Sequence, residues 1–212
     1  MTAAATDPTA LPVRDGATVM LVRDGEAVDR PLEVLMLQRH PDTAFGAVWA
    51  FPGGVVDDAD RVASHVDDGH ASARIGLEAG GGAFWAAALR ETREETGLAL
   101  EAHDLHYFSH WITPFGAPKR YDTRFFVALA PAGQHVHDER EHIDSTWIRP
   151  VDALARHVAG DLDMILPTIR NLEAIGRFPT AGELVTAAAA TTEPRAIDDG
   201  GGWRIRLPGD PT

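Results

Sequence analysis

Residues 89–98, LRETREETGL, decide what this chain can be. Within them Glu91, Glu94 and Glu95 stand at positions i, i+3 and i+4. On a helix that spacing places the three carboxylates within about a third of the circumference. The longer run 83–96, AFWAAALRETREET, consists of good helix formers apart from its threonines, and a glycine follows it as at a helix C-terminus. We therefore predict a helix with one acidic stripe.

Three like charges on one stripe repel each other, and a divalent cation is a natural compensation. Because the donors are all oxygens, they suit Mg²⁺ or Mn²⁺ better than zinc. Arg90 and Arg93 flank the stripe and can hold individual carboxylates by bidentate hydrogen bonds. A solvated surface helix with mixed charges is the alternative for a bare Glu-x-x-Glu-Glu pattern.

Upstream of the helix, two apolar runs, 17–22 and 32–37, flank a turn signal and predict a hairpin with a longer loop. The segment Pro52-Gly53-Gly54 should end any regular element, and a tight glycine turn lets backbone carbonyls approach an ion or ligand. Acidic residues follow it at Asp57, Asp58 and Asp60. Residues 61–82, with the run Gly80-Gly81-Gly82, have the composition of an inserted surface loop that has room for a short helical turn.

The remaining elements complete one domain of the α+β class or with α/β/α layers, spanning residues 1–212. A loose leader is expected at 1–14, and C-terminal helices and a tail at 161–212. The predicted strands are 105–111, 121–130, 145–148 and a late one at 203–207, and the predicted helices are 151–158, 165–175 and 183–190.

Composition excludes several classes of protein. The chain has 212 residues, 44% hydrophobic, with a formal charge of −13 and no cysteine. Such a charge disfavours binding to nucleic acid, and the missing cysteines exclude disulfides, thiol nucleophiles and iron–sulfur sites. No apolar run approaches the roughly 20 residues that span a bilayer, so no membrane contact is expected. We expect a cytoplasmic protein, and a homodimer is compatible with the sequence.

The motif resembles the Nudix box, G-x5-E-x7-R-E-U-x-E-E-x-G-U. Residues 90–98, RETREETGL, match its second half except at Thr92, where the family has an apolar residue. Gly54 and Asp60 match the first half, with a shorter acid in place of the glutamate. Between Asp60 and Arg90 stand the 29 residues 61–89, where the family has seven. Loop closure entropy grows only logarithmically with length, so such an insertion is tolerable.

The interrupted box resembles peroxisomal-type coenzyme A diphosphatases, as do the stretches 51–57 (FPGGVVD), 111–114 (WITP) and 120–126 (RYDTRFF). The resemblance implies an α/β/α sandwich with a mixed sheet and extra C-terminal helices. It implies that Glu91, Glu94 and Glu95 bind the metal with the carbonyl of Gly54, and that Arg90 orients a box glutamate. Glu141 would supply a further catalytic acid, with Asp138 and Glu139 as alternatives.

The family's substrates are nucleoside diphosphates linked to another moiety, so a small nucleotide is the expected partner. One carboxylate would accept the proton of the attacking water. Phosphate recognition would fall to basic residues, for which the candidates are Arg39, Lys119, Arg120 and Arg124. Trp111, Phe115 and Tyr121 either stack a base or pack in the core.

Coenzyme A or acyl-coenzyme A is the substrate that the resemblance favours. ADP-ribose or another nucleotide-sugar or dinucleotide is the alternative, since Pro114 lies near the position of a proline typical of ADP-ribose enzymes. A nucleotide-sensing module without catalysis is a third hypothesis, which the three retained acids disfavour. The histidines at 65, 70, 135, 137 and 142 fit surface loops better than a metal site.

Overall fold

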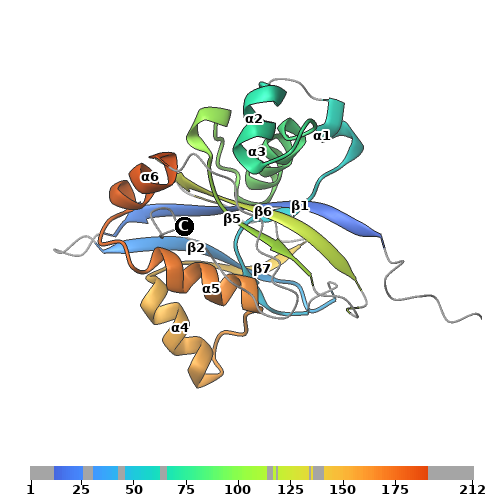
Figure 1. Cartoon of the computed structure of the whole chain (residues 1–212). Coiled ribbons are helices and arrows are strands. Elements are labelled where there is room, and N and C mark those ends of the chain that lie inside the picture. The colour runs from blue at the N-terminus through green and yellow to red at the C-terminus, as the bar shows by residue number, and fades with distance from the viewer. Residues whose placement is uncertain are drawn as a thin grey trace, which may run out of the picture.

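Seven strands form one mixed sheet, and helices cover both of its faces (Figure 1). The computed structural model describes residues 12–25, 31–42, 46–62, 66–113, 117, 119–133, 135 and 141–190. The strands are β1 (Val13–Asp24), β2 (Leu32–Arg39), β3 (Trp49–Ala50), β4 (Gly53–Val55), β5 (His106–Ile112), β6 (Arg120–Leu129) and β7 (His142–Ile148). The helices are α1 (Asp58–Val62), α2 (Asp68–Ile75), α3 (Gly82–Thr96), α4 (Pro150–Ala159), α5 (Leu166–Ile175) and α6 (Ala181–Ala190), with a 3-10 turn η2 (Ala102–Asp104).

The strand order is β3-β2-β1-β6-β5, with β4 also paired to β1 and β7 to β2. The long pairing of β1 with β6 is parallel and the other pairings are antiparallel, so the sheet is mixed, as predicted. The antiparallel β1–β2 pair confirms the hairpin expected at the start of the domain.

Helices α1, α2 and α3 lie on one face of the sheet, above it in Figure 1, and α4 and α5 lie below it. Strand alternation divides the core accordingly. On β1, Val19 and Leu21 belong to the cluster under α3, whereas Met20 and Val22 belong to the cluster under the C-terminal helices. This arrangement confirms the α/β/α sandwich with additional helices at the C-terminal end.

The three C-terminal helices confirm the patterns seen in the sequence, and each begins within two residues of its predicted start. Pro167 lies in the first turn of α5, where a proline leaves no hydrogen bond unmade. The late strand predicted at 203–207 and residues 1–11 of the predicted leader 1–14 lie outside the described residues. Val13 and Arg14, at the end of that predicted leader, belong to β1.

The insertion differs from the expected surface loop. It contains α2, whose Ala71 and Ile75 are buried in the same cluster as α3. The α2 segment also caps α3: Asp68 accepts hydrogen bonds from the backbone N–H groups of Gly80 and Gly82 at 2.9 and 2.8 Å, and Ser72 Oγ accepts one from Gly81. Exposed donors at a helix N-terminus need such partners, so this segment supports the acidic helix.

The break expected at Pro52-Gly53-Gly54 is confirmed for β3, which ends at Ala50, but the break is only two residues long. Gly53 instead begins β4, which pairs antiparallel with β1. A Cβ on Gly53 would lie 2.4 Å from the carbonyl oxygen of Ala17, so only glycine lets this short strand join the sheet there.

Within the described ranges, no helix combines the length and the apolar character needed to cross a membrane.

Candidate active site

The acidic stripe is carried by α3, which ends where Gly97 adopts a left-handed conformation (φ 71°) and donates to the carbonyl of Arg93. The three carboxylates differ sharply in exposure. The side chain of Glu94 is 59% exposed, that of Glu91 is 14% exposed, and that of Glu95 is 4% exposed. The stripe therefore runs from solvent into the junction between α3 and the sheet.

Two glycines of β4 bring the sheet backbone against these carboxylates. The N–H of Gly53 donates to Glu95 Oε2 at 2.7 Å. A Cβ on Gly54 would lie 2.2 Å from Glu91 Oε1, so this contact excludes any larger residue without a shift of Glu91. The Gly-Gly pair and the helix, 37 residues apart in sequence from Gly54 to Glu91, thus form one site.

Arg90 joins the two halves of the motif across the insertion. Its Nε and Nη2 donate to the two oxygens of Asp60 at 3.1 and 2.8 Å, and Nη2 also donates to the carbonyl of Val55. Burial would raise the pKa of Asp60, but the hydrogen bonds from Arg90 and the Asp57 backbone hold it below its usual range. Arg90 Nη1 also donates to Glu91 and Glu94, at 2.9 and 3.2 Å. Arg90 and Asp60 are therefore in contact despite the 29 intervening residues.

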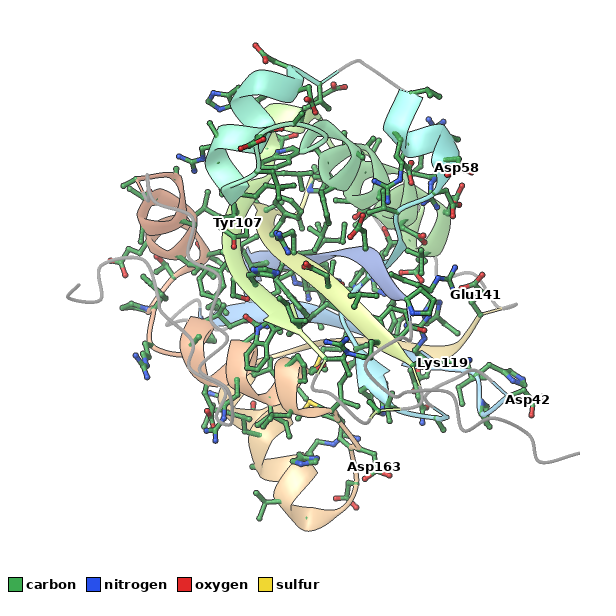
Figure 2. All side chains as sticks on the ribbon, turned by 45° about the vertical axis from the view of Figure 1, so that its right-hand side comes forward. Asp42, Asp58, Tyr107, Lys119, Glu141 and Asp163 are labelled. Carbon is green, nitrogen blue, oxygen red and sulfur yellow. The ribbon has the colours of Figure 1, made fainter. Side chains whose placement is uncertain are left out.

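Burial, with a smaller effect of neighbouring charges, shifts the pKa values of two of the carboxylates. Burial raises the pKa of Glu95 to about 8, and the charges of Glu91 and Glu141 add to the rise while the Gly53 amide and Arg39 oppose it. Burial also raises the pKa of Glu91, against the opposing charge of Arg90. Figure 2 shows Glu141 on the same side of the molecule as the start of α1. Glu141 is thus close enough to act on the stripe, whereas Asp138 and Glu139 lie outside the described residues.

These donors fit a hard divalent cation. They are all carboxylate oxygens, they repel each other, and a backbone segment without side chains lies against them. Arg90 draws Glu91 and Glu94 toward itself, and among the described side chains no three acids or histidines form a ready coordination sphere. A cation would relieve the repulsion that Arg90 now offsets in part.

A cavity of about 230 Å³ opens on the other side of β4, between the sheet and the start of α5. Among its lining side chains Arg39 is the one that carries a charge, and its Nε is buried without a hydrogen-bond partner in the described structure. Four aromatic residues and four threonines also line it: Phe51, Trp111, Tyr121, Phe125, Thr18, Thr113, Thr123 and Thr168. Gly53 and Gly54 line it as well, so the cavity adjoins the acidic site.

Arg120 and Arg124 are not brought to this cavity. Residues alternate between the faces of β6, so Tyr121 and Thr123 face the cavity and Arg124 faces α3. The Arg124 guanidinium contacts Asp122 and His110 and lies 5.1 Å from the centre of the Phe84 ring. Arg120 is buried, and its Nε donates to the carbonyl of Thr113.

Of the predicted substrate residues, Arg39 lines the cavity, and Lys119 is exposed immediately before β6 (Figure 2). Thr123 and Thr168 were not predicted. Alternation along the predicted strand 121–130 could have indicated Thr123, because it shares a face with Tyr121. No local signal marks Thr168, which reaches the cavity because α5 packs on the sheet.

His142 also departs from the expectation. It is 2% exposed rather than on a surface loop, and its Nε2 lies 3.5 Å from Glu95 Oε1. His135 bonds Ser145 and Trp147 instead, and His65, His137 and Phe115 lie outside the described residues.

The sequence model of a protein family, the NUDIX domain, matches residues 12–166. A NUDIX hydrolase from Alicyclobacillus acidocaldarius is 26% identical, with a TM-score of 0.65 over 84% of this chain and 97% of that one. The NUDIX domain of Shewanella oneidensis NrtR, crystallised with ADP ribose, is 16% identical, with a TM-score of 0.55 over 79% and 89%. A C. elegans Ap4A hydrolase is 19% identical, with a TM-score of 0.50 over 76% and 93%. These last two likenesses are of fold alone. A search of the curated proteins found no match.

Proposed function

The chain belongs to the NUDIX family, and on that premise we propose that it is a metal-dependent hydrolase that cleaves the diphosphate of a nucleoside-diphosphate-linked compound. The observation that best supports this proposal is the contact of two α3 carboxylates with the β4 backbone, which also lines the aromatic cavity. A bound diphosphate would lie beside the carboxylates, with its organic part in the cavity.

Nudix hydrolases generally use divalent metal ions. In this chain Glu91, Glu94 and Glu95 would hold Mg²⁺ or Mn²⁺, with the carbonyl of Gly54. When bound, the cation supplies neutralisation of the phosphate oxygens and activation of water. Arg90 orients Glu91 and Glu94 through its hydrogen bonds to both, and Asp60 in turn fixes Arg90.

Glu141 is the proton acceptor that we assign to the attacking water. It is exposed immediately before β7, and its charge acts on both Glu91 and Glu95. A carboxylate within reach of the attacking water can accept its proton as a general base.

Arg39 would bind a phosphate oxygen of the substrate. Its buried Nε has no partner among the described residues, and an anion there would satisfy it. The aromatic rings of Trp111, Tyr121 and Phe125 offer faces for a nucleobase, and the cavity's threonine hydroxyls can donate to or accept from its polar edge.

Coenzyme A and ADP-ribose differ in the number of cations that they require. The motifs FPGGVVD, WITP and RYDTRFF favour coenzyme A, whose 3′-phosphate needs a further cationic partner. With Arg124 held by Asp122 on the other face, Lys119 is the cation that we assign to that phosphate, because it lies two residues from Tyr121. The single charged residue of the cavity favours ADP-ribose, which has the diphosphate alone.

The deciding experiment compares kcat/KM for coenzyme A, dephospho-coenzyme A and ADP-ribose in Mg²⁺, with products identified by mass. A coenzyme A diphosphatase gives 4′-phosphopantetheine and adenosine 3′,5′-bisphosphate, and Lys119→Ala lowers its kcat/KM for coenzyme A but not for dephospho-coenzyme A. Arg177→Ala, at an exposed position, is the control. Equal losses on both substrates would remove the 3′-phosphate role, and faster cleavage of ADP-ribose than of either would assign the enzyme to that substrate.

A further inference from the structure

We infer that His142 is a positioning residue that fixes the orientation of the Glu95 carboxylate for metal binding, an inference that rests on the proposed function. Both side chains are buried, at 3% and 4% exposure, and His142 Nε2 lies 3.5 Å from Glu95 Oε1. His142 belongs to β7, and the spacing of the acids on α3 gives no indication that it lies beside Glu95.

The backbone at His142 is held from two sides. His142 pairs with Arg39 on β2, next to an irregularity in the register between Gln38 and Arg39. The N–H of His40 donates to the carbonyl of Glu141 at 2.8 Å, which ties the residue before His142 to β2. The imidazole therefore projects from a fixed point of the sheet toward the helix.

The two oxygens of Glu95 face different strands. Oε2 accepts the Gly53 N–H from β4 at 2.7 Å, and Oε1 faces the imidazole from β7. A carboxylate contacted at both oxygens cannot rotate about its terminal bond without losing one contact. Each oxygen has two lone pairs, so these contacts leave lone pairs on Glu95 for a cation.

Such support is a recognised determinant of affinity at metal sites. Partners that orient a ligating carboxylate typically change metal affinity about 10- to 100-fold when they are removed. Of the three stripe carboxylates, Arg90 contacts Glu91 and Glu94. Glu95 is the most buried of the three, and His142 is the side chain that contacts it as Arg90 contacts the other two.

The test is a Mn²⁺ titration of the full chain, by calorimetry, comparing wild type with His142→Gln and His142→Asn. Glutamine carries its amide nitrogen about as far from the backbone as imidazole Nε2, whereas asparagine falls one bond short. We expect His142→Asn to weaken Mn²⁺ binding about 10- to 100-fold and His142→Gln to recover most of that loss. His103→Asn, at a site where the side chain is 83% exposed, is the matched control.

The outcomes separate the two proposals. A wild-type protein that binds no Mn²⁺ would overturn the proposed function. Wild-type affinity in His142→Asn would overturn the positioning role. Equal weakening in both variants would overturn it too, because a loss of packing alone does not depend on how far the amide group reaches. Thermal unfolding in EDTA identifies any variant that fails to fold. If His142→Asn fails in this way, His142→Ser, whose side chain is also too short to reach Glu95, takes its place: weaker Mn²⁺ binding than in His142→Gln supports the role, and wild-type affinity overturns it.

Discussion

Replacing Glu95 by glutamine should change the way the protein's stability depends on pH. Burial, opposed by the Gly53 amide and Arg39 but reinforced by Glu91, raises the pKa of Glu95 to about 8 from an ordinary 4.5. Between those pH values the folded protein binds more protons than the unfolded chain. Its stability in the presence of EDTA must therefore fall as the pH rises through this window.

The expected size follows from the two pKa values. For each unit that the pH rises well inside this window, the unfolding free energy of the wild type falls by up to about 1.4 kcal/mol. Glutamine does not ionise, so the unfolding free energy of Glu95→Gln lacks this pH dependence. Between pH 5 and pH 7.5 the unfolding free energy of Glu95→Gln should therefore rise relative to wild type by about 3 kcal/mol. The sign is notable, because the variant that damages the metal site should be the more stable protein at pH 7.5 in EDTA.

Urea unfolding at pH 5.0, 6.0, 7.0 and 7.5 in EDTA measures this difference, with Glu183→Gln on the exposed face of α6 as the control. Adding Mn²⁺ at pH 7.5 should then stabilise the wild type more than Glu95→Gln, because the variant lacks one carboxylate ligand. A wild-type-to-variant difference that stays constant from pH 5.0 to pH 7.5 would refute the argument from burial.

Three further substitutions test other parts of the site. Gly54→Ala should leave the unfolding free energy within about 1 kcal/mol of wild type, since the flexible Glu91 side chain can move aside. The displaced Glu91 should nevertheless weaken Mn²⁺ binding measured by calorimetry. Wild-type Mn²⁺ affinity would contradict the role given to the contact between Gly54 and Glu91. Ile75→Ala should lower the unfolding free energy in urea by about 2–4 kcal/mol, whereas Val62→Ala, at an exposed position, should lower it by less than about 0.5 kcal/mol. Equally small effects of the two substitutions would show that residues 61–82 are a surface loop, as the sequence predicted. Arg39→Ala should lower kcat/KM about 10- to 100-fold for every substrate that carries a diphosphate, and an unchanged value would remove its phosphate contact.

Local patterns in the sequence predicted the regular elements well. The helix former run before Gly97 gave α3, the two apolar runs gave β1 and β2, and Pro167 marked the start of α5. These features depend on spacing and backbone preference within a few residues, which a single sequence displays directly.

The failures depended on contacts between distant segments. Ile75 lies in an acidic, glycine-rich stretch, and its burial arises only because α2 packs on α3. The burial of Glu95 likewise depends on β4 and β7, which the helical spacing of the three acids does not show. Arg124 is a substrate candidate because of its charge and its place in the RYDTRFF stretch, and its ion pair with Asp122 is a contact that neither feature shows.

The most direct test of the central claim is diphosphate hydrolysis with and without a chelator. Purified protein is incubated with coenzyme A, ADP-ribose and diadenosine polyphosphates in Mg²⁺ or Mn²⁺, and the products are identified by mass. We predict cleavage of at least one compound at its diphosphate, abolished by EDTA, restored by added metal, and reduced about 10²- to 10⁴-fold in kcat by Glu94→Gln. Turnover that continues unchanged in EDTA, or no cleavage of any of these compounds with either metal, would contradict the account.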